Sequence, residues 1–102
     1  MKSYCLIELH NIPGKSIDNN ILNYCLEKLK KEIYDNEIAT TLSKWLNQIK
    51  NQKKYIMTWK LHYDLDETKY KILEEKLWSK LVIYYNTLNL KYMSIKKIDL
   101  NR

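Results

Sequence analysis

The spacing of apolar residues changes between a period of two and a period of about 3.6 along this chain, which limits the folds it can adopt. Residues 4–10 and 55–63 alternate apolar and polar side chains almost throughout, as half-buried β-strands do. Residues 17–33, 38–49 and 70–88 instead place apolar side chains three or four positions apart, as amphipathic helices do. The chain is therefore expected to combine strands with helices.

The order of these segments predicts an α+β fold. Residues 90–100 are interpreted as a last strand, so the order is strand, helix, helix, strand, helix, strand. With all helices on one face, this order gives a two-layer α/β sandwich with a three- or four-stranded sheet. The length of 102 residues fits a single domain over residues 1–102. Because helices link the first two strands, we expect these strands to be adjacent and parallel.

Residues 81–85, Leu-Val-Ile-Tyr-Tyr, fit two kinds of element. Their β-branched and aromatic side chains favour a strand, whereas the apolar stripe of the preceding helix continues through them. We expect one long helix to about Tyr85. A helix that stops near Ser79 and is followed by a hairpin is the alternative.

Turn and cap residues mark where the elements end. Pro13 and Gly14, the only proline and glycine in the chain, predict a turn after the first strand. Residues with side chains that cap helix N-termini precede two of the helices. The candidate cap of the first helix is Ser16 or Asp18, and that of the third helix is Asp64 or Asp66.

The cysteines, histidines and glycine favour neither a metal nor a cofactor. The two cysteines and two histidines lack the paired spacing of zinc sites, and Cys5 and Cys25 lie in apolar segments, as reduced core thiols do. Gly14 and Lys15 lie between a strand and a helix, but the further glycine that a phosphate-binding loop needs is absent. No apolar run approaches the ~18 residues of a membrane helix. We therefore expect a cytoplasmic protein without cofactor, metal or membrane partner.

The chain is basic, with 18 Lys and Arg against 12 Asp and Glu and a net charge of +6. Nucleic acid is therefore a candidate partner, although AT-rich coding would also raise the lysine content. Because almost all of these cations are lysines, contacts to the nucleic-acid backbone are favoured over the reading of bases. The expected basic surface comprises Lys28, Lys31, Lys44, Lys50, Lys53 and Lys54.

The aromatic residues are nine tyrosines and three tryptophans, with no phenylalanine. Coding bias does not explain this, because phenylalanine codons are as AT-rich as those of tyrosine. Tyr and Trp combine an apolar ring with a polar group and are enriched at interfaces. The expected interface anchors are Tyr34, Tyr84, Tyr85 and Tyr92.

A weak similarity between residues 6–11 and 58–63 gives one geometric hypothesis. If the two strands pair in that register, Glu8 faces Lys60 and His10 faces His62. A metal-independent ribonuclease needs two imidazoles as acid and base and a cation beside the phosphate. His10, His62 and Lys60 are therefore the candidate catalytic residues, while a metal site that adds Asp64 is less favoured.

The sequence contains no complete catalytic motif, so its main functional prediction is a small non-enzymatic binding protein. We expect an accessory protein of phage or mobile-element type that engages nucleic acid or blocks a protein that handles it. The alternatives are the ribonuclease-like enzyme and a homodimeric module that pairs through open sheet edges.

Overall fold

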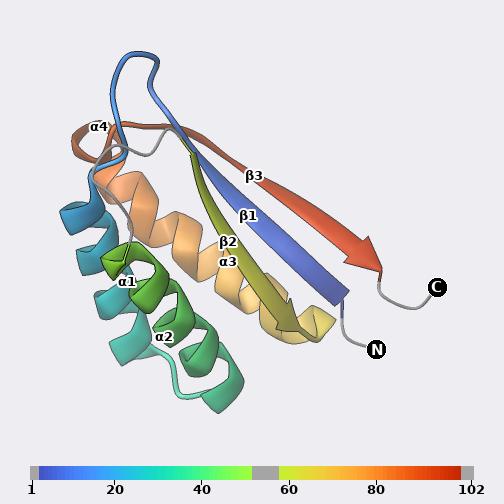
Figure 1. Ribbon diagram of the computed structural model, residues 1–102. Coiled ribbons are helices and arrows are strands. Elements are labelled where there is room, and N and C mark those ends of the chain that lie inside the picture. The colour runs from blue at the N-terminus through green and yellow to red at the C-terminus, as the bar shows by residue number, and fades with distance from the viewer. Residues whose placement is uncertain (1–2, 52–57, 100–102) are drawn as a thin grey trace.

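The chain forms a three-stranded sheet with its helices on one side (Figure 1). The computed structural model describes the backbone of residues 3–51 and 58–99 and the side chains of residues 6–51 and 65–96. The elements are β1 (Ser3–Asn11), α1 (Asn19–Glu32), α2 (Asn36–Lys50), β2 (Thr58–Leu65), α3 (Glu67–Leu81), a short 3₁₀ turn η1 (Val82–Tyr84), α4 (Tyr85–Leu88) and β3 (Leu90–Asp99). The α+β class predicted from the sequence is confirmed.

The sheet has the order β2-β1-β3, and β1 runs antiparallel to both neighbours. The prediction that the first two strands are parallel was therefore wrong. The physical reason is the number of helices between them. One helix brings the chain back to the start of the first strand, but α1 and α2 form a hairpin that returns it to the end where β1 finished, so β2 must run the opposite way.

The register explains the alternating pattern of the strands. Ile7 and Leu9 of β1 are fully buried, and the residues opposite them on β2 are Leu61 and Trp59. Successive side chains of a strand point to opposite faces, so Glu8 and His10 lie on the face away from the core. That second face is the one that no described helix covers (Figure 1).

Aspartates cap the three longer helices. The carboxylates of Asp18 and Asp35 each accept hydrogen bonds from two backbone N–H groups of the first turn, and Asp66 accepts one from Lys69. Of the alternatives for the first and third helices, Asp18 and Asp66 are therefore the caps.

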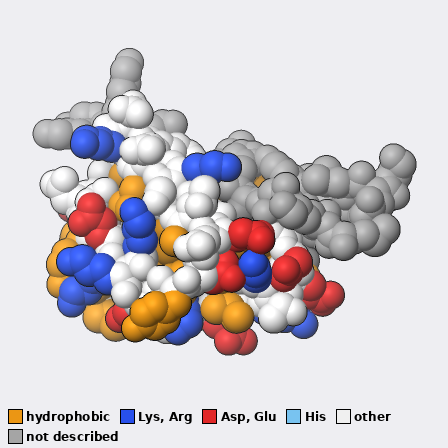
Figure 2. Space-filling view, turned by 90° about the horizontal axis from the view of Figure 1, so that it is seen from below, with side chains coloured by type: hydrophobic (Ala, Val, Ile, Leu, Met, Phe, Trp, Pro, Cys, Tyr) orange, Lys and Arg blue, Asp and Glu red, His pale blue; other side chains and the backbone are white. Residues whose placement is uncertain are grey.

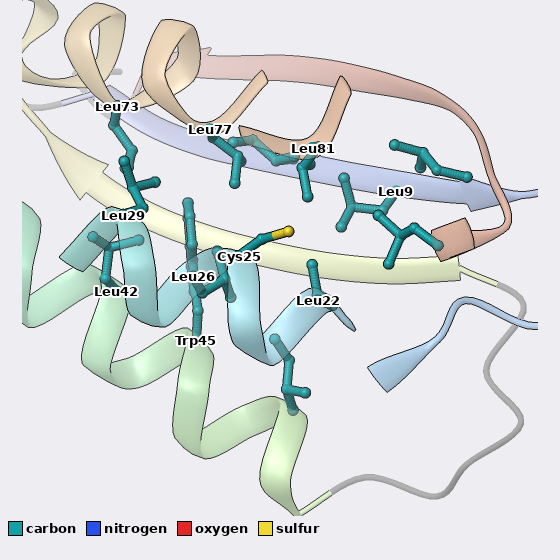
Figure 3. Close-up of a cluster of buried hydrophobic side chains, with 14 of the residues drawn as sticks. Leu9, Leu22, Cys25, Leu26, Leu29, Leu42, Trp45, Leu73, Leu77 and Leu81 are labelled. Atoms are coloured by element: carbon teal, nitrogen blue, oxygen red, sulfur yellow. The ribbon is translucent and has the colours of Figure 1, made fainter. Parts of the chain in front are cut away.

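The core fills the space between the helices and the sheet. Figure 3 shows side chains of α1, α2 and α3 pointing toward one another beside Leu9 of β1. Among the described residues, Trp45 of α2 is the largest fully buried side chain. The leucines of α1 and α3 around it are those that the helical period predicted, including Leu22, Leu26, Leu29, Leu73, Leu77 and Leu81.

The ambiguous segment 81–85 is helical throughout. Helix α3 ends at Leu81, the 3₁₀ turn η1 follows, and α4 continues to Leu88. The strand alternative is therefore wrong, and the expected single helix to about Tyr85 is interrupted by η1 after Leu81. Leu81 and Leu88, on either side of the interruption, are both fully buried. The expected turn at Pro13 and Gly14 is also present.

Among the described residues, no helix combines the length and the apolar character that crossing a membrane requires.

Candidate functional site

The antiparallel register separates the two histidines of the catalytic hypothesis. His10 is opposite Thr58, whereas His62 is opposite Leu6. The two positions are thus four residues apart along the ladder, about 13 Å at the usual rise of a strand. The prediction that His10 faces His62 was wrong, because it required parallel strands. Lys60 is opposite Glu8 as expected, but the side chains of Lys60 and His62 lie outside the described residues.

The same register argues against the metal alternative. Asp64 is opposite Tyr4, at the other end of the ladder from His10. Within the residues that the structure describes, no group of three His, Cys, Asp or Glu side chains is placed to hold a metal ion.

His10 instead belongs to a polar cluster on the helix-free face of the sheet. Its Nε2 atom lies 3.1 Å from Oγ of Ser94 and 3.6 Å from a carboxylate oxygen of Glu8. The imidazole stacks on the ring of Tyr92, with 4.2 Å between ring centroids, and Lys96 lies 3.8 Å from the other oxygen of Glu8. The sheet therefore presents a stacked aromatic pair beside a cation.

This cluster contains Glu, His and Ser but lacks the geometry of a nucleophilic triad. In such a triad the carboxylate accepts a hydrogen bond from one ring nitrogen and orients the ring, while the other ring nitrogen takes the proton of the hydroxyl. Here Glu8 and Ser94 both approach Nε2 of His10. The arrangement orients the ring for stacking and does not activate Ser94.

The expected basic surface is spread over different sides of the helices. Lys44 and Lys50 are both exposed on α2, but six positions of helix place them about 120° apart around its axis. Lys28 and Lys31 are exposed on α1, and Lys53 and Lys54 lie outside the described residues. Figure 2 shows lysines interspersed with acidic and hydrophobic side chains on the face that it presents. Lys44 and Lys50 therefore lie on different sides of α2.

The four tyrosines expected at an interface belong to four segments: the turn between α1 and α2, η1, α4 and β3. Tyr34 is 97% exposed in the turn between α1 and α2. Tyr92 stacks on His10, and Tyr85 donates a hydrogen bond to the carbonyl of Lys91. Tyr84 packs partly against the core and meets the ring of Tyr24 edge-on, with 5.8 Å between centroids.

The Tyr24–Tyr84 contact is the centre of a mixed aromatic and basic surface. The ammonium of Lys28 lies 5.0 Å from the centroid of the Tyr24 ring, a cation–π contact one helical turn along α1. Tyr24 is 45% exposed, and Ile83, next to Tyr84 in the chain, is 69% exposed. We call Tyr24, Lys28, Ile83 and Tyr84 the Tyr24 patch.

Hydrogen bonding within the Tyr24 patch shifts the pKa values of its members. A hydrogen bond from Lys28, followed by one from Tyr84, lowers the pKa of Tyr24. The same contacts raise the pKa of Lys28 and of Tyr84 above their ordinary values. Tyr24 therefore stabilises the charged form of Lys28, whose ammonium lies over its ring.

Sequence reasoning found Lys28 and Tyr84 but missed Tyr24 and Ile83, which complete the patch. One signal was available for Tyr24, because it lies outside the apolar stripe of its helix and four residues before Lys28. No sequence signal marks Ile83, whose exposure depends on the 3₁₀ turn at the end of α3.

Cys25 is a free thiol buried beside this surface, as expected. Burial raises its pKa, so the thiolate is disfavoured and the group is unreactive. The side chain of Cys5 lies outside the described residues.

Comparison of the chain with protein-family models, curated proteins and solved structures finds no match.

Proposed function

We propose that this chain is a binding protein that docks on an acidic protein surface through the Tyr24 patch. The observation that carries the proposal is a 69% exposed isoleucine next in the chain to Tyr84, whose ring meets Tyr24 and its cation–π partner Lys28. Aromatic side chains supply much of the binding energy at protein interfaces, and an exposed aliphatic residue gains from burial in a partner's pocket.

The chemistry of the patch favours a protein over a nucleic acid. Ile83 needs an apolar pocket, which protein surfaces offer and a phosphate backbone does not. Lys28 and the net charge of +6 select a surface of opposite sign and speed the encounter with it. A chain of this charge would be repelled from a basic nucleic-acid groove, so if the target handles nucleic acid, docking occurs away from that groove.

The test is capture of partners from an extract of the source cells, using the immobilised chain and single variants. We expect Ile83→Asp and Tyr24→Ala to weaken binding to the captured protein at least about 30-fold, the size of a hot-spot loss. The matched control is Ile72→Asp, because Ile72 is a 40% exposed isoleucine of α3 outside the patch.

A photo-crosslinking residue at position 83, compared with one at position 72, would locate the contact. A partner that binds the patch variants as tightly as the wild type would refute the proposal. So would crosslinking that is no stronger at position 83 than at position 72.

A second candidate is single-stranded nucleic acid on the helix-free face of the sheet. The observation in its favour is the stacked pair of His10 and Tyr92 with exposed Lys96 nearby. Aromatic rings on an open sheet face stack unpaired bases, while lysines hold the backbone. The half-buried carboxylate of Glu8 between these groups weakens the attraction for phosphate, so this candidate ranks below the protein partner.

A further inference from the structure

We propose that two copies of this chain pair through their β3 strands, antiparallel across a two-fold axis, with Ile95 opposite Ile95 of the second copy. This inference is independent of the Tyr24 patch. Strand β3 is an edge of the sheet, since β1 is its only neighbour in the described fold. Figure 1 shows no described segment beyond it. Its ten residues offer a long row of backbone groups for pairing.

Symmetry restricts the registers that such a pair can adopt. Along a strand, alternate residues turn their N–H and C=O groups toward the same edge, and residues opposite each other in an antiparallel pair must both face the ladder or both face away. In two identical strands, opposite residues must therefore lie an even number of positions apart. The two-fold axis then lies midway between the two copies of one residue, which are opposite each other.

Charge distinguishes the registers near the middle of β3. With the axis at Ser94, Lys91 is opposite Lys97, and with the axis at Lys96, two copies of Lys96 are opposite each other. Like charges at opposite positions destabilise a pair of strands.

With the axis at Ile95, no lysine is opposite a lysine. Lys91 is then opposite Asp99, and this opposite-charge pair occurs twice because of the two-fold symmetry. Lysines on an edge strand normally oppose its pairing with another strand. Here they still allow two copies of β3 to pair along residues 91–99, in the register centred on Ile95.

Apolar burial adds to this backbone pairing. Ile95 is opposite the buried Ile7 of β1, on the core face of the sheet, yet it is 36% exposed at the edge. A second copy paired along β3 would cover Ile95 and add its burial to the backbone hydrogen bonds. At the start of the strand, the carbonyl of Lys91 accepts a hydrogen bond from Tyr85.

The first test is sedimentation velocity over a concentration series, with circular dichroism to verify folding. We expect the wild type to form a species of twice the 12.5 kDa chain mass. Ile95→Lys would place two ammonium groups on the axis and raise the dimer dissociation constant at least about tenfold. Ile72→Lys is the control, because Ile72 is similarly exposed at 40% but lies elsewhere on α3.

The second test reads the register and does not depend on the fold of a charged variant. Residues opposite each other have Cα atoms about 4.5–5.5 Å apart, within reach of a disulfide. We therefore expect Ile95→Cys to form a dimer under mild oxidation and Ile72→Cys to form none. A wild type that stays monomeric at about 1 mM would overturn the proposal. A dimer that Ile95→Lys leaves intact, or one without the crosslink at position 95, would also overturn it.

Discussion

Asn89 is the residue on which the junction between the helices and β3 depends. Its backbone has a φ of 64°, in the left-handed region that asparagine tolerates better than other residues with a β-carbon. Its side-chain amide donates to the carbonyl of Ser16 at 3.0 Å, and its own carbonyl accepts from the N–H of Ile12 at 2.8 Å. One residue thus ends α4 and holds the loop that follows β1.

We predict that Asn89→Ala lowers the free energy of unfolding by about 2 kcal/mol, from the left-handed backbone and the lost hydrogen bond. Asn89→Gly loses only the hydrogen bond and should cost about 1 kcal/mol. Urea unfolding of the two variants and the wild type measures both values. Equal losses for Ala and Gly would show that the backbone conformation contributes nothing.

Single residues of the candidate surfaces could be predicted only in part. Lys28 and Tyr84 were identified from residue type, because lysine and tyrosine carry binding chemistry wherever they are exposed. Their grouping with Tyr24 depends on how α1 packs against the turn η1, a contact between residues sixty positions apart. Periodicity describes one element at a time and cannot supply such a contact.

Ion pairs join the helices at both ends of α3. Lys69 contacts the carboxylates of Asp35 at 3.1 Å and Glu37 at 3.0 Å, and Lys80 contacts Glu32 at 2.6 Å. The hydrogen bond from Lys80 lowers the pKa of Glu32. The backbone N–H of Ile38, followed by Lys69, lowers the pKa of Asp35.

These shifts predict a loss of stability in acid. A carboxyl group whose pKa is lower in the folded chain stabilises the fold above its unfolded pKa, and the contribution disappears as the pH falls through the folded value. The ordinary values are 4.5 for Glu32 and 3.8 for Asp35. We therefore expect the melting temperature to begin falling near pH 5 and to continue falling below pH 3.8, as measured by circular dichroism.

Lys80→Met separates the two contributions. Lys80 is the largest cause of the Glu32 shift, so the variant should lose the part of the pH dependence that begins near Glu32's ordinary value of 4.5. The Asp35 part should persist, because a backbone N–H group is its main cause. A pH profile identical to that of the wild type would show that the Lys80–Glu32 pair contributes no stability.

Most elements could be predicted from the sequence, whereas strand pairing could not. The three longer helices were identified by their apolar stripes, and the first strand by its alternation. The direction of β2 relative to β1 was missed because the rule for helical crossovers was applied to a helical hairpin. The predicted pairing of His10 with His62 depended on parallel strands, so the error in strand direction also produced the error at the site.

At the scale of the whole molecule, the positive charge is spread over the surface. The net charge is +6, yet the described helices carry glutamates as well as exposed lysines, and the lysines lie on different sides of the helices. Several basic side chains are also held by carboxylates, namely Lys69, Lys71, Lys80 and Lys96. Over the residues whose side chains are described, the surface attracts polyanions while its lysines face different sides of the molecule.

This distribution predicts the salt dependence of binding to single-stranded RNA. Each phosphate neutralised on a single strand contributes about −0.7 to the slope of log K against log salt, so contact with about three phosphates gives a slope near −2. We expect weak binding with a slope of about this size, measured by fluorescence anisotropy. Tyr92→Ala should weaken it if bases stack on the sheet, while Tyr34→Ala, at the far turn, should not.

The size of the slope also tests the choice between the two candidate partners. A slope near −4 would correspond to contact with about six phosphates and would require lysines gathered on one surface. Lys53 and Lys54 would then be the first residues to replace with glutamine. That result would favour nucleic acid as the partner. If the slope is shallow and Tyr92→Ala leaves binding unchanged, the positive charge acts only by general attraction of polyanions. A protein partner that covers the Tyr24 patch would then be the better explanation of why Ile83 is exposed.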